Sequence, residues 1–202
     1  MRLPPDFSSR PVCTSLYGEA SQIHARSQME LPSRSEVEHI IARLKAERQY
    51  GLNPNRVRVK LVERFKSQAE VGPFTFVSDE PDERGGRGDG PAPLEYFLAG
   101  FAFCQLSIGA AHAALMGLRL DSVEISVRGI VNERGIYGFA GISPAMQDIK
   151  YEIRVQSPDS PERIRAWLQA IEDGCPAYNT IRHPPPLLRR LFLNGEEVSL
   201  GG

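Results

Sequence analysis

The chain has 202 residues, of which 41% are hydrophobic and 24% are charged, and its formal net charge is −1. These values are typical of a soluble globular protein with one large domain, or with one domain and an extension. A net charge near zero excludes the strongly basic surface that nucleic-acid binding requires.

The cysteine content indicates the redox compartment. Three cysteines in a chain of this length exclude the disulfide framework of a small secreted domain. The first residues also lack the apolar segment of a signal peptide. We therefore expect a cytoplasmic protein whose thiols stay reduced and available for chemistry.

The N-terminal part of the chain divides into an arm and a helix. Residues 1–32 are rich in Pro, Ser and Arg without hydrophobic periodicity, so we expect an arm or tail. Helical spacing of apolar residues predicts a helix over residues 33–52, with Ser35 as N-cap and Gly51 as C-cap. The main domain is then expected to comprise residues 53–202.

Two short strands and a long loop are predicted next. Apolar and polar residues alternate over residues 57–63 and again over residues 74–77. The segment DEPDERGGRGDGPAP, residues 79–93, is dense in Gly, Pro and charge, and predicts a loop in which Asp79 and Glu80 are solvated. Its glycines resemble those of a phosphate-binding loop, but the Lys-Thr ending is missing, so no nucleotide site is predicted.

The longest apolar run extends from Leu94 to Leu118 and predicts a long helix that starts at Pro93. This run is long enough to cross a membrane, but Glu95, Gln105 and His112 interrupt it. We therefore expect a central helix buried within protein, and no membrane partner.

The remainder of the chain returns to strands and then to helices. Alternation predicts strands over residues 123–127 and 149–155. A helix is predicted from Ser160 to Gly174, a short helix after Cys175, and a terminal hairpin on an Asn-Gly turn. Because the strands cluster instead of alternating with helices, we predict an α+β fold with antiparallel sheets.

Cys104 and Cys175 are the candidates for redox chemistry. Cys104 lies in the apolar helix, where a thiol is inert unless a cation reaches it. Cys175 stands at a helix start, whose unpaired N–H groups stabilise a thiolate. The alternative is that both cysteines fill the core, since free Cys is among the most buried residue types. The candidate cations for Cys104 are Arg64, Lys66, Arg84 and Arg87.

Several segments together resemble a known family. They are FVSDEPDERGG and GPAPLEYFLAGFAFC before and in the long helix, LDSVEISVRGIVNERGIYGFAG after it, and finally YEIRVQSPDSPERI and GCPAYNT. Over residues 56–190 the chain resembles the OsmC/Ohr family of osmotically inducible and organic hydroperoxide resistance proteins. The resemblance implies an intertwined homodimer of α+β chains, in which the long cysteine-bearing helix is central.

The resemblance also implies a function. Cys104 matches the cysteine that attacks an organic hydroperoxide, and Cys175 matches the resolving cysteine. The oxidised protein would carry a Cys104–Cys175 disulfide that an external dithiol reduces, and no metal, haem or flavin is needed. The aromatic residues Tyr96, Phe97, Phe101 and Phe103 would suit an alkyl hydroperoxide.

Two departures from the family pattern leave the activity open. The family's catalytic Glu, ten residues before the first Cys, corresponds to Leu94, and Glu95 follows one residue later. The activating Arg of the early strands is assigned here to Arg64. The loop pattern is closer to a less characterised OsmC-like branch. The sequence thus supports two hypotheses: a thiol-dependent peroxidase, and a non-enzymatic dimer that binds a small hydrophobic molecule with structural cysteines.

Overall fold

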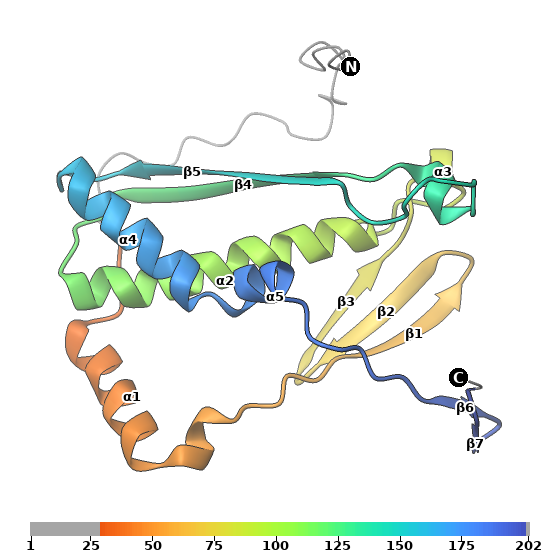
Figure 1. Cartoon of the computed structure of the whole chain (residues 1–202), viewed down its shortest axis with the longest axis horizontal. Coiled ribbons are helices and arrows are strands. Elements are labelled where there is room, and N and C mark those ends of the chain that lie inside the picture. The colour runs from red at the N-terminus through yellow and green to blue at the C-terminus, as the bar shows by residue number, and fades with distance from the viewer. Residues whose placement is uncertain (1–28, 201–202) are drawn as a thin grey trace, which may run out of the picture.

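The computed structural model describes residues 29–200, so most of the predicted N-terminal arm lies outside the described residues (Figure 1). Helix α1 (Arg34–Ala46) begins with a capping box between Ser33 and Glu36. The predicted N-cap at Ser35 is wrong, because Ser35 already lies within the helix and the side chain of Ser33 accepts from the Glu36 N–H at 3.2 Å. The helix also ends earlier than predicted, and a 3₁₀ turn, η1 (Arg48–Gly51), follows it.

The first sheet is antiparallel, with the order β1–β2–β3. Its strands are β1 (Arg58–Glu63), β2 (Lys66–Val71) and β3 (Phe74–Ser78). The sequence predicted β1 and β3 but missed β2. The reason is its composition, KSQAEV, which lacks the apolar alternation of a half-buried strand and buries only Ala69.

Helix α2 (Pro93–Met116) is the central element, as predicted. Pro93 occupies its first position, and it ends at Gly117, which has a left-handed φ of 61°. By length and composition this helix could cross a membrane. However, α1, β4 (Ser122–Ile130), α4 (Pro161–Gly174) and α5 (Pro176–Arg182) all pack against it, as they would around the core helix of a protein.

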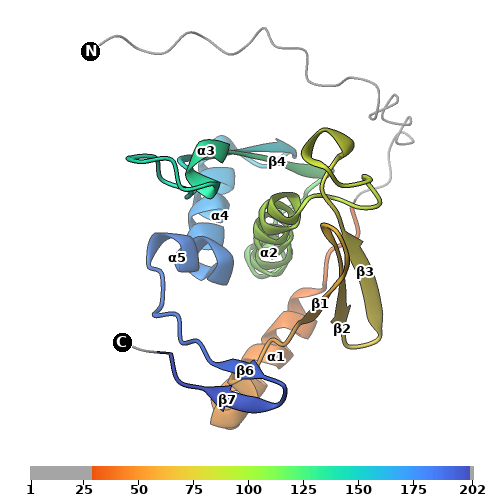
Figure 2. The same cartoon turned by 90° about the vertical axis from the view of Figure 1, so that its right-hand side faces the viewer.

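The second sheet pairs β4 with β5 (Asp148–Gln156) in antiparallel register. The connection between them contains the short helix α3 (Glu133–Ile136). Figure 2 shows this sheet over α2, with α4 and α5 on one side of the helix and β1–β3 on the other. The terminal hairpin of β6 (Leu191–Leu193) and β7 (Glu196–Val198) turns at Asn194 and Gly195, as predicted. The fold is therefore α+β.

The core lies where α4 crosses α2. Trp167 is almost completely buried, and its indole N–H donates to the carbonyl of Gly109 at 2.8 Å. A Cβ atom at Gly109 would lie 3.0 Å from both Trp167 and Ile171, so glycine permits this close crossing. The crossing carries the end of α4, and with it Cys175, to the middle of α2.

Candidate functional site

The fold brings the two predicted cysteines together. Cys104 comes from the middle of α2, and Cys175 forms the corner between α4 and α5. Cys104 packs against the buried cluster that contains Cys175, and both are free thiols. Burial raises the pKa of Cys175, and the neighbouring Cys104 raises this pKa further. Residues far apart in the sequence thus form one dithiol site.

Cys175 lies at a helix start, as predicted, but it is fully buried. Its Sγ atom accepts from the Tyr178 N–H at 3.5 Å, which is the side-chain contact of an N-cap. Burial raises the pKa of Cys175, and the N–H groups of Tyr178 and Ala177 lower it by less, so the net pKa is raised. The helix start therefore does not by itself make this thiol a thiolate.

Cys104 lies at the border between the buried and the exposed face of α2. Phe101, one turn before it, is buried, whereas Phe103 is 70% exposed and Phe97 is also exposed. Tyr96 points to β3, where its hydroxyl donates to the Val77 carbonyl at 2.7 Å. The four aromatic residues expected to line one apolar pocket therefore face different directions within a single chain.

Two of the four candidate cations, Arg84 and Arg87, lie in the loop of residues 79–93, and the other two bind residues of this loop. Arg64 lies in the β1–β2 turn at a positive φ of 47°, and its guanidinium donates twice to the Gly85 carbonyl, at 2.6 and 3.1 Å. The other three form ion pairs: Lys66 with Asp89 (2.8 Å), Arg87 with Glu63 (3.0 Å), and Arg84 with Glu80 (3.4 Å) and Glu133 (2.5 Å). Among the hydrogen bonds within residues 29–200, none joins these cations to Cys104.

The loop itself is organised around Asp79. The prediction that this residue is solvated is wrong, because it is only 2% exposed. Its carboxylate accepts from the backbone N–H groups of Glu80 (2.9 Å), Arg87 (2.9 Å) and Asp89 (3.4 Å). Burial alone would raise the pKa of Asp79, but these three donors and Lys66 lower it below its usual value. Hence the glycine-rich segment has a defined conformation, held by hydrogen bonds to Asp79, and is not a loose linker.

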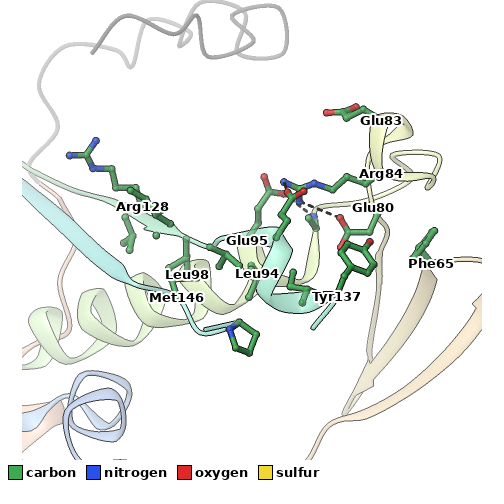
Figure 3. Close-up of a pocket in the computed structure, with 18 residues that line it drawn as sticks. Phe65, Glu80, Glu83, Arg84, Leu94, Glu95, Leu98, Arg128, Tyr137 and Met146 are labelled. Carbon is green, nitrogen blue, oxygen red and sulfur yellow. Dashed lines mark hydrogen bonds and ion pairs between the residues drawn. The ribbon is translucent and has the colours of Figure 1, made fainter. Parts of the chain in front are cut away.

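Glu95 does not approach the thiols within one chain. Its carboxylate accepts from the Ala92 N–H at 2.8 Å, and so it caps the start of α2. Nine residues separate it from Cys104, which is about 14 Å along a helix axis. Glu95 and Leu94 instead line an open cleft of about 1090 Å³ that Cys104 and Cys175 do not line (Figure 3). Arg84 lies in this cleft with its two carboxylate partners.

A polar cluster beside the dithiol was missed from the sequence. The hydroxyl of Tyr151 on β5 donates to the carboxylate of Glu172 on α4, and burial together with this carboxylate raises the pKa of Tyr151. Gln105 is fully buried next to them. Its amide is near enough to affect the pKa of Tyr151, but within the described residues neither amide atom has hydrogen-bond geometry with a partner.

The sequence carries a signal for only one member of this cluster. Gln105 interrupts an apolar helix, which marks a polar residue on a buried face. The pairing of Tyr151 with Glu172 depends on how α4 packs against β5. Within residues 29–200, no group of three or more His, Cys, Asp or Glu side chains could hold a metal ion.

Comparison with known proteins identifies the fold and a family. The family model described as "OsmC-like protein" matches residues 86–188. A hydroperoxide reductase of Mycoplasma genitalium is 28% identical over 95 residues, which cover 47% of this chain and 64% of the relative, less than two thirds of its length. A hydroperoxide reductase of Mycoplasma pneumoniae is 24% identical over 109 residues, 54% of this chain and 73% of the relative.

Solved structures agree at the level of the fold. The crystal structure of an OsmC-like protein from Mycoplasma pneumoniae has a TM-score of 0.57 and 21% identity, and covers 65% of this chain and 89% of that chain. An organic hydroperoxide resistance protein from Legionella pneumophila has a TM-score of 0.50 and 18% identity, with 66% and 92% covered.

Proposed function

The chain belongs to the OsmC-like protein family, and we propose that it reduces organic hydroperoxides with the thiols of Cys104 and Cys175. The observation that carries the proposal is the packing of Cys104 against the buried cluster that contains Cys175, and both cysteines are free thiols. The names of the two Mycoplasma relatives support a peroxide-related role.

The proposed reaction has two steps. The thiolate of Cys104 attacks the outer oxygen of the hydroperoxide, the O–O bond breaks, and the alkoxide takes a proton and leaves as an alcohol. Cys104 keeps the oxygen as a sulfenic acid. The sulfur of Cys175 then attacks the sulfur of Cys104, the S–O bond breaks, and the hydroxide leaves as water with the proton of Cys175. An external dithiol, of the kind present in a reducing cytoplasm, reduces the disulfide.

A second copy of the chain is part of the proposal. One chain leaves large apolar side chains exposed on α2 and on β1: Phe97, Phe103, Val59 and Leu61. Burying such residues is what an obligate homodimer interface does. We propose that Arg64, and the carboxylate of Glu95, act at the interface, because within its own chain Arg64 donates to the Gly85 carbonyl and Glu95 accepts from the Ala92 N–H.

Thiol titration tests the proposal. One equivalent of cumene hydroperoxide should remove two thiols per chain and lower the mass by about 2 Da, the two hydrogens lost in a disulfide. Cys104→Ser should abolish the loss, and Cys175→Ser should leave a sulfenic acid that dimedone traps. Cys13→Ser changes the third cysteine of the chain, in the predicted N-terminal arm; it is the matched control and should behave as the wild type. Retention of the thiol loss in Cys104→Ser would contradict the assigned roles.

A second candidate function is a non-enzymatic dimer that binds a small hydrophobic molecule. It is favoured by the large cleft beside α2, whose lining includes Leu98, Ile130 and Met146. In this case peroxide would consume the thiols slowly or not at all. Replacing Leu98 by Asp would weaken binding of an apolar fluorescent probe to the cleft.

A further inference from the structure

The corner between α4 and α5 is held by side chains that have no part in the chemistry described above. We propose that Asn179, Tyr151 and Glu172 are positioning residues for Cys175, which keep its thiol opposite Cys104 for disulfide closure. This inference rests on the proposed function, since closure is the second step of that reaction.

Asn179 ties α5 to the end of α4. Its side-chain N–H₂ lies within hydrogen-bond distance of three carbonyls, those of Glu172 (2.9 Å), Cys175 (3.0 Å) and Asp173 (3.3 Å). The last carbonyls of a helix have no partner within that helix, so Asn179 supplies donors that α4 lacks. One side chain thus fixes the angle at which the chain turns at Cys175.

Tyr151 and Glu172 tie the same corner to the second sheet. Tyr151 projects from β5, and its hydroxyl donates to the Glu172 carboxylate in the last turn of α4. The rings of Phe101 and Tyr178 pack edge-on against Tyr151, with centroids 5.4 and 6.5 Å away. Tyr178 in turn donates its N–H to the sulfur of Cys175. These contacts run without a break from β5 to the thiol.

The corner needs such anchors because Cys175 belongs to neither helix. It has an extended conformation, with φ −81° and ψ 114°, between two helices. Disulfide formation tolerates little displacement, since the Cβ atoms must come within about 3.5–4.5 Å of each other. Loss of an anchor should therefore slow closure while the attack of Cys104 on peroxide stays unchanged.

The test separates these two steps in the same samples. Asn179→Asp keeps the size of the side chain but removes its donors, and Tyr151→Phe removes only the hydroxyl. Both variants should form the Cys104 sulfenic acid at the wild-type rate, and its conversion to the disulfide should slow by about tenfold or more, which is about 1.4 kcal/mol or more of barrier. Trapping with dimedone followed by mass spectrometry measures that lifetime.

Three further variants show that the effect is one of positioning. Glu172→Gln keeps an acceptor for the Tyr151 hydroxyl and should close nearly as fast as the wild type, whereas Glu172→Leu should be as slow as Tyr151→Phe. Gln169→Ala removes an exposed hydrogen bond to Asp173 on the same helix and should have no effect. Unchanged closure in Asn179→Asp and Tyr151→Phe, or equal slowing of both steps, would overturn the inference.

A peroxide-free oxidation keeps the inference testable if the proposed function fails. Diamide takes two hydrogens from a dithiol and becomes a hydrazine, so it can form the Cys104–Cys175 disulfide without a sulfenic acid. With diamide, disulfide formation in Asn179→Asp and Tyr151→Phe should also be about tenfold slower than in the wild type. A wild-type protein that loses no thiols with peroxide would refute the proposed function alone. Equal closure rates with diamide would refute the positioning role.

Discussion

Replacement of Gln105 by Leu should stabilise the protein. Both amide atoms of Gln105 are buried, and neither has a hydrogen-bond partner among residues 29–200. A buried polar group left without a partner costs about 1–3 kcal/mol. Leu has a similar size and no polar atoms, so Gln105→Leu should raise the free energy of unfolding by about 1–3 kcal/mol. For a chain of this length each kcal/mol corresponds to roughly 2–4 °C in Tm.

The measurement is urea denaturation at two protein concentrations, which separates stabilisation of the chain from stronger assembly. Gln169→Leu is the control, because this residue is exposed on α4 and should change the free energy by less than about 0.5 kcal/mol. A Gln105→Leu variant that is no more stable than the wild type would refute the reasoning. In that case the amide has a partner, either a buried water molecule or a group from a second chain.

Three further outcomes follow from the geometry. Gly109→Ala should lower the free energy of unfolding by about 1 kcal/mol or more through overpacking against α4; an unchanged denaturation midpoint would contradict this. Because the folded-state pKa of Asp79 is lowered, its contribution to stability is present above pH 3.8 and is lost as the pH falls through the folded pKa. Asp79→Asn should therefore flatten the acid side of a plot of Tm against pH, and an unchanged slope would count against its role. Iodoacetamide at pH 7.5 should label Cys104 before Cys175, which is buried and has a raised pKa; peptide mass spectrometry showing equal labelling would disagree.

The elements with strong local signals were predictable from the sequence. Pro93 and Gly117 mark the two ends of α2, and Ser160 with Pro161 marks the start of α4. These residues act through their own backbone conformation and their nearest neighbours in the chain, so no tertiary contact is needed to recognise them. Strand β2 was missed for the opposite reason, because its pairing partners on both sides, and not its own composition, make it a strand.

The candidate site divides in the same way. Cys104 and Cys175 were found from their local settings and from the family resemblance, and the crossing of α4 over α2 at Gly109 brings them together. The burial of Asp79 and the pairing of Tyr151 with Glu172 had no local signal. Burial, pKa and hydrogen-bond partners depend on which surfaces meet in space, and a one-dimensional pattern of residues does not contain that information until the helices and sheets have packed.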